Sequence, residues 1–150
     1  MQWFMDIYNN AVITVPAFAW FVTQVMKVIY DIEKYKRIDI RRFVGSGGMP
    51  SSHAAFVTSL ATVVGVKSGW HSPEFGVAFA LAMVVMYDAT GVRRAAGKQA
   101  QVLNKLIAES QESGKLSNLD VKLKELIGHT PIEVLVGGII GILFGLIFSS

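Results

Sequence analysis

The sequence predicts an all-α protein, an integral membrane helical bundle with about four apolar helices. Three observations predict it. Of the 150 residues, 52% are hydrophobic and 17% are charged, whereas a soluble domain carries about 25% charged residues. Long stretches without charge recur along the chain, and Lys and Arg gather in two of the connections between them. The length fits a single domain, 1–150, and the lack of Cys excludes disulfides and cysteine-ligated metals.

The first apolar segment, at about 7–30, is long enough to cross a bilayer. It holds no charge from Ile7 to Met26, a run of 20 residues, and a helix needs about 20 apolar residues to span the hydrocarbon layer. Lys27 follows directly, and we expect its side chain to extend toward the interface.

The next two apolar segments, at about 51–69 and 74–92, are shorter. Because uncharged runs of about 10–14 residues often belong to buried or re-entrant helices, we expect a hairpin of short, tilted spans. Two crossings plus a half-inserted hairpin are the alternative. The hairpin would turn at 67–73, where Trp70 and Pro73 are typical of a turn at the membrane surface.

The last apolar segment, at about 131–149, carries glycines at four-residue intervals, Gly137, Gly141 and Gly145. Small residues in this pattern let another helix approach closely. The partner is either a helix of the same chain or a second copy, so a homo-oligomer through this ridge is one expectation.

The connection at about 93–128 is too long to lack structure of its own. Apolar residues at helical spacing predict that the helix of the third segment continues into it. We expect a break at Ser113 and Gly114, then a second short helix at about 119–127 that Gly128 ends.

The basic residues indicate how the bundle is oriented. Twelve of the 14 Lys and Arg residues lie in the two long connections, while Lys67 alone lies in the hairpin turn. Loops rich in Lys and Arg stay in the cytoplasm. We therefore expect a multi-pass protein of the cell membrane with both basic loops, including the helical connection, in the cytoplasm and both termini outside. The positive charge then requires no binding to nucleic acid.

A glycine-rich loop enters the second apolar segment through Gly48, Pro50, Ser51, Ser52 and His53. Free backbone N–H groups at a helix start, together with two hydroxyls, form a natural anion site, and His53 could donate a proton to a leaving group. The alternative is structural, with one serine capping the helix and the glycines forming a flexible connection.

The fourth segment begins beside a second histidine. His129 and Glu133 are four residues apart, so they share one helical face, and the carboxylate could orient the imidazole. The alternative is a helix cap, in which Thr130 and Glu133 form a capping box with Pro131 at the first helical position.

Basic residues follow the third segment. Arg93, Arg94 and Lys98 lie just beyond it, and guanidinium groups clamp phosphate with two hydrogen bonds. The positive charge of cytoplasmic loops explains the same residues without a function. Asp88 extends the apolar segment, and an acid there needs a partner, most simply Arg93 or Arg94.

The topology brings these segments together. His53 enters the second apolar helix, Asp88 leaves the third, and His129 enters the fourth, each at the cytoplasmic end. Caps arising by chance would be scattered over both membrane faces. We therefore expect these polar groups to meet in one layer.

Three stretches, GGMPSSHAA, YDATGVRRAAGKQAQVLN and GHTPIEVLVGGIIGI, resemble in this order the divergent branch of the type 2 phosphatidic acid phosphatase family. That family is related to acid phosphatases and vanadium-dependent haloperoxidases. In the wider superfamily, PSSH resembles a Pro-Ser-Gly-His motif and HTPIE resembles a His-x-x-x-Asp motif. The resemblance covers nearly the whole chain.

The resemblance implies a membrane phosphatase that hydrolyses a lipid or isoprenoid phosphate through a phosphohistidine, without a metal or cofactor. His129 would attack phosphorus, Glu133 would orient it, and His53 would protonate the leaving oxygen. The phosphate would be held by Ser51, Ser52, Arg93, Arg94, Lys98, Lys34 and Arg41, with Gly48, Pro50 and Asp88 supporting the site.

The chain departs from the superfamily pattern at several points. Ser52 replaces the motif glycine, and Leu123 stands where an arginine is expected before the nucleophilic histidine. Lys34 and Arg41 match the first motif only in part, and four apolar segments replace the usual six helices. The alternative function is therefore a non-catalytic membrane protein, a scaffold or assembly factor, that binds anionic lipid headgroups in the same basic pocket.

Overall fold

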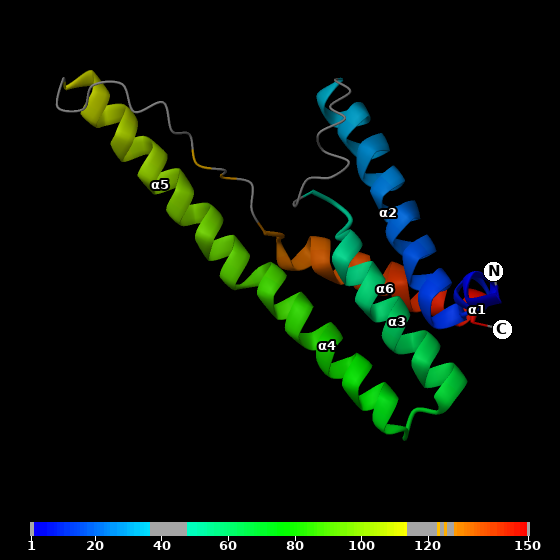
Figure 1. Cartoon of the computed structure of the whole chain (residues 1–150). Coiled ribbons are helices and arrows are strands. Elements are labelled where there is room, and N and C mark those ends of the chain that lie inside the picture. The colour runs from blue at the N-terminus through cyan, green and yellow to red at the C-terminus, as the bar shows by residue number, and fades with distance from the viewer. Residues whose placement is uncertain (1, 37–47, 114–122, 124, 126–127, 150) are drawn as a thin grey trace.

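The computed structural model describes residues 2–36, 48–113, 123, 125 and 128–149. Its helices are α1 (Gln2–Tyr8), α2 (Ala11–Tyr35), α3 (Ser52–Ser68), α4 (Pro73–Thr90), α5 (Val92–Glu112) and α6 (Pro131–Phe148), with no strand in the described part. The all-α prediction is confirmed. Figure 1 shows α2 and α4 on either side of α3, α6 crossing α3, and α5 continuing the line of α4.

Three helices of the described part are long and apolar enough to cross a membrane: Ala11–Tyr30 in α2, Pro73–Gln111 in α4 and α5, and Pro131–Phe148 in α6. The expected count of four is therefore not exact. The remaining apolar segment forms α3, which has 17 residues. At 1.5 Å per residue such a helix is about 25 Å long, shorter than the roughly 30 Å hydrocarbon layer.

The central helix of the bundle is α3, which packs against α2, α4 and α6. Its buried positions carry mostly small or hydroxyl-bearing side chains. The Thr58 hydroxyl donates to the carbonyl of Ala54 at 2.8 Å and also approaches the carbonyl of Gly138 in α6 at 3.0 Å. Between membrane helices, small side chains and such hydrogen bonds allow close packing.

The glycine ridge of α6 lies against this central helix. A Cβ at Gly137 would overlap the Ser51 backbone, and a Cβ at Gly141 or Gly145 would overlap the backbone and threonine side chains of α3. The ridge is therefore covered within one chain. The alternative expectation, a homo-oligomer through these glycines, has no exposed surface on which to form.

The first apolar segment is interrupted, contrary to the expectation of one helix from Ile7. The short α1 ends at Tyr8, and the Asn10 side chain caps α2 by accepting a hydrogen bond from the Val12 N–H at 3.0 Å. Asn competes for backbone hydrogen bonds in this way, so it favours helix caps over helix interiors.

A single residue, Gly91, separates α4 from α5, so the third apolar segment continues into the connection as predicted. The helix ends directly before Ser113, at the predicted break. The predicted second helix lies mostly outside the described residues. Within it, Leu123 and Glu125 are hydrogen-bonded to the Asn104 side chain of α5.

Candidate active site

Backbone hydrogen bonds join the three helix ends that carry the predicted site. The N–H of His129, just before α6, donates to the carbonyl of Ala89 near the end of α4 at 3.0 Å. The N–H of Ser51, which caps α3, donates to the carbonyl of Glu133 in the first turn of α6 at 3.0 Å. One buried apolar residue from each of these three helices forms a small cluster close by. The starts of α3 and α6 are thereby fixed beside the end of α4.

Gly128 makes this approach possible. Its φ is +97°, a conformation that residues with a Cβ rarely adopt. A Cβ at this position would also overlap the backbone of Arg93 and Arg94 at the start of α5. Because glycine alone meets both conditions, the chain can bring His129 directly onto the junction of α4 and α5.

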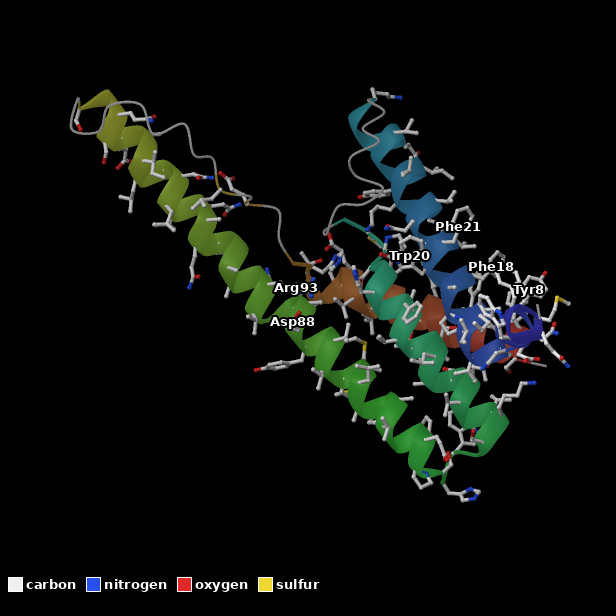
Figure 2. All side chains as sticks on the ribbon, in the orientation of Figure 1. Tyr8, Phe18, Trp20, Phe21, Asp88 and Arg93 are labelled. Carbon is white, nitrogen blue, oxygen red and sulfur yellow. The ribbon has the colours of Figure 1, made fainter. Side chains whose placement is uncertain are left out.

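A pocket of about 160 Å³ opens at this junction. Its polar lining consists of His53 from α3, Asp88 from α4, Arg93 from α5, and His129. Figure 2 shows Asp88 and Arg93 side by side where α4 meets α5. A cavity of about 150 Å³ accepts a benzene-sized ligand, so this pocket has room for a phosphate group.

His129 is held by the cap of α6. Its side chain is buried, with 4% of the residue exposed, and its Nδ1 lies 3.2 Å from Oε2 of Glu133. The same oxygen accepts the N–H of Thr130 at 3.0 Å, while the Thr130 hydroxyl accepts the N–H of Glu133 at 3.4 Å. The capping box and the His–Glu pair therefore coexist. A carboxylate at Nδ1 favours the tautomer protonated there, which leaves a lone pair on the other ring nitrogen.

Burial lowers the pKa of His129 below the usual 6.5, and the positive charge of Lys27 lowers it further. Hydrogen bonds with Glu133 and with the Gly48 backbone raise the pKa, and so does the negative charge of Glu133. These effects do not outweigh burial and Lys27, so the pKa of His129 remains below its usual value. The imidazole is therefore neutral at pH 7. A neutral imidazole carries the lone pair that a nucleophile needs.

Asp88 has the partner that the sequence predicts. Its Oδ2 accepts a hydrogen bond from Nε of Arg93 at 2.5 Å. Because a guanidinium has five N–H donors, Arg93 retains donors for an anion in the pocket. Arg94 and Lys98 are exposed and do not line this pocket.

The two serines are buried beside the pocket rather than in its lining. Ser51 caps α3, with its hydroxyl accepting from the N–H of Ala54 at 3.4 Å, so the structural alternative holds for this residue. The Ser52 hydroxyl is buried without a hydrogen-bond partner among the described residues. An unsatisfied buried hydroxyl costs about 1–3 kcal/mol, so Ser52 favours a ligand or water that would bind it.

Lys27 lies beside the site, contrary to the expectation that its side chain extends toward the interface. Instead of extending toward the interface, it is 1% exposed. Its stem lies against the loop at Gly48, where a Cβ would be 3.5 Å from the lysine Cγ and Cδ. Its charge acts on both imidazoles, His53 and His129. A buried charge within an apolar segment is expensive and commonly functional.

A signal for this arrangement was present in the sequence. Thr23 and Gln24 precede Lys27 by four and three residues, so the three share one face of an otherwise apolar helix. All three are buried in the structure. A polar stripe of this kind predicts an inward direction, which a single lysine at a helix end does not.

The other residues predicted for the site are Lys34, Arg41 and Pro50, and none of them lines the pocket among the described residues. Arg41 lies outside the described residues, and only the backbone of Lys34 is described, in α2. Pro50 is buried between Gly48 and the cap of α3. Over the described ranges, no three His, Asp or Glu side chains gather as metal ligands. The polar groups that line the pocket are two imidazoles and the guanidinium of Arg93, which is paired with the carboxylate of Asp88. With the buried Lys27 close by, this set suits an anion.

Apolar helices long enough to cross a membrane, with a pocket lined by two histidines and an ion pair at their ends, are typical of an integral membrane protein. The model of the Divergent PAP2 family matches residues 8–144, and the chain belongs to that family. It is also 40% identical to the "Uncharacterized membrane protein YuiD" of Bacillus subtilis (strain 168), over 97% of this chain and 98% of that relative. No solved structure matches the chain.

Proposed function

We propose that this protein is a membrane phosphatase that hydrolyses a lipid or isoprenoid phosphate through a phosphohistidine, without a metal, at the cytoplasmic face. The observation that carries the proposal is the shared pocket, in which His53, Arg93 and His129 surround a space large enough for a phosphate group. Phosphoryl transfer needs a positioned nucleophile, a proton donor and fixed positive charge. These three residues would supply them.

The reaction has two steps. In the first step His53 must be an imidazolium. Burial, followed by the charges of Arg93, His129 and Lys27, lowers its pKa in the protein alone, and the negative charge of a bound phosphate would raise it again. The lone pair of His129 then attacks phosphorus, the bond to the ester oxygen breaks, and His53 gives its proton to that oxygen as the alcohol leaves. Glu133 stabilises the positive ring that forms. In the second, water attacks phosphorus, His53 takes a proton from the water, and the nitrogen–phosphorus bond breaks. Inorganic phosphate leaves, and both histidines return to their starting states.

Positive charge in the site would come from two directions. Arg93 lines the pocket, and the buried Lys27 acts on both imidazoles from α2. Together they would replace the motif arginine, whose place Leu123 occupies. The backbone of Leu123 is hydrogen-bonded to the Asn104 side chain, which ties this position to α5.

The proposed cytoplasmic location of the pocket rests on the distribution of Lys and Arg residues along the chain. The two connections rich in Lys and Arg join helices at the pocket end, whereas the hairpin turn lies at the other end of α3 and α4. Because the chain has no Cys, single cysteines at Ser68 and Ser113 would report sidedness in intact cells. An impermeant maleimide should label Ser68→Cys and spare Ser113→Cys, and the reverse pattern would place the pocket outside.

The deciding experiment measures phosphate release by purified protein from phosphatidic acid and from prenyl phosphates, with a chelator present. We expect release without metal and inhibition by vanadate, since a mimic of the transition state binds more tightly than the substrate. Acid-labile label from a ³²P lipid phosphate should accumulate on the wild-type chain and be absent from His129→Ala. Turnover with no phosphoenzyme would overturn the phosphohistidine step.

A second candidate function is non-catalytic binding of anionic lipid headgroups. It is favoured by the buried Lys27, which could hold a phosphate without reacting, and by the departure from the motif at Leu123. A lipid phosphate that purifies with the protein unhydrolysed, with no release from any lipid tested, would establish this function and refute the phosphatase.

A further inference from the structure

A second cavity, of about 330 Å³, lies beside the phosphate pocket. Its lining comes from three helices: Ala17 and Trp20 of α2, His53, Phe56 and Val57 of α3, and Val85 of α4. His53 and Val85 line both cavities. The polar pocket and this apolar groove are therefore neighbours that meet at the side chain of His53.

The arrangement of the helices explains the groove. In the described part of the chain, α2 and α4 both pack against α3, and their backbones do not come close to one another. Figure 1 shows them diverging on either side of it. Their facing sides form two walls, and α3 forms the floor. Because α2 and α4 both contain candidate membrane spans, the groove opens toward lipid.

We infer that this groove binds the hydrocarbon chain of the alcohol that leaves in the proposed reaction. The substrate would then be a phosphate monoester of a long-chain lipid alcohol, whose chain lies between α2 and α4 on α3. This inference rests on the proposed function, because the phosphate must occupy the neighbouring pocket.

The in-line geometry of phosphoryl transfer determines on which side of phosphorus the hydrocarbon chain of the substrate lies. In phosphoryl transfer the attacking and leaving atoms lie roughly in line on opposite sides of phosphorus. If His129 attacks and His53 protonates the leaving oxygen, the group on that oxygen must lie on the His53 side. The groove is lined by His53 and not by His129, so it receives the leaving alcohol.

The lining also favours a hydrocarbon over a polar alcohol. Apart from the His53 imidazole and the indole N–H of Trp20, the side chains that line the groove are hydrocarbon. A sugar or an unacylated glycerol bound here would leave free hydroxyls without partners, at about 1–3 kcal/mol each. Acyl and isoprenoid chains are both hydrocarbon and meet this requirement equally. The experiment below therefore compares alkyl with prenyl probes.

The experiment uses alkyl and prenyl phosphonates that carry a diazirine in the chain. A phosphonate cannot be hydrolysed, so binding is measured without turnover. After illumination in detergent micelles, we expect crosslinks in the peptides that contain Trp20 and Phe56. Inorganic vanadate, competing for the phosphate pocket, should abolish these crosslinks. Crosslinks spread over the exposed faces of α4 and α6 would show that the probe binds non-specifically, as a detergent does. Either that result or crosslinks insensitive to vanadate would overturn the inference.

A matched pair of variants tests the same point. Ala17 is exposed on a wall of the groove, while Ala80 is exposed on α4 outside its lining. Filling the groove with Ala17→Trp should weaken labelling about tenfold, the size of a typical overpacking cost, and Ala80→Trp should not change it. Equal labelling of the two variants would refute the groove. Failure of the phosphatase proposal would instead appear as no phosphate release by the wild-type chain, which the labelling does not require.

Discussion

The two ends of the bundle begin helices with nearly the same residues, yet they build different environments. At the turn end, α4 begins within the sequence HSPE at 71–74, and at the pocket end, α6 begins within HTPIE at 129–133. Each helix is capped by a hydroxyl side chain: Ser72 accepts from the Phe75 N–H at 3.1 Å, and Thr130 accepts from Glu133. Local sequence thus produces the same cap twice.

The difference lies in what surrounds the histidine. His71 is exposed in the turn, whereas His129 is buried, bound to Glu133 and placed against α4 by the fit of Gly128. A histidine beside a helix cap becomes a candidate nucleophile when packing removes water from it and brings a carboxylate to one ring nitrogen. Paired substitutions at the two ends can test that conclusion.

The largest difference should come from the histidines themselves. His129→Ala removes the proposed nucleophile and should lower kcat by about 10⁴-fold or more, while His71→Ala should leave it unchanged. Phosphate release from a lipid phosphate measures both variants. Full turnover by His129→Ala, or an equal loss in both, would refute the assignment of the pocket end as the active site.

The carboxylates provide the next comparison. Glu133→Gln keeps a side chain that can complete the capping box but removes the charge that orients His129, and kcat/KM should fall by about 10³-fold. Because Glu133 raises the pKa of His129 against the effect of burial, its loss should move the acidic limb of the pH profile to lower pH. Glu74→Gln should change neither quantity. A limb that stays in place would contradict the His–Glu pairing.

The gathering of His53, Asp88, Arg93 and His129 could be predicted from the sequence because each lies at one end of an apolar segment, and topology brings such ends together. The side-chain direction of Lys27 could not be predicted in this way. It follows from the polar face that Lys27 shares with Thr23 and Gln24, which indicates how α2 is rotated against α3. Arg93 and Arg94 are both exposed, and only Arg93 lines the pocket; which of the two does so depends on the same kind of helical rotation.

A lysine at each end gives the third comparison. Lys27→Met removes the buried charge and should lower kcat/KM by about 100-fold, whereas the exposed Lys67→Met should not. Since the Lys27 charge lowers the pKa of His129, its removal should move the acidic limb to higher pH, opposite to Glu133→Gln. A purely structural role for Lys27 would reduce activity without moving the limb.

The smallest effect is expected from the helix caps. Substitutions there distinguish the contribution of a cap to stability from its contribution to the active site. Thr130→Ala and Ser72→Ala each remove a capping acceptor and should each destabilise the protein by about 1 kcal/mol, seen as similar shifts in thermal unfolding followed by helical ellipticity. Only Thr130→Ala should also reduce kcat/KM, because the Thr130 hydroxyl accepts the N–H of Glu133 and so fixes the backbone from which the carboxylate reaches His129. Thr130→Asn should restore both properties, since Asn caps as well as Thr. Equal activities for the two alanine variants would mean that the N–H groups of Thr130 and Ser51 hold Glu133 in place without the Thr130 hydroxyl.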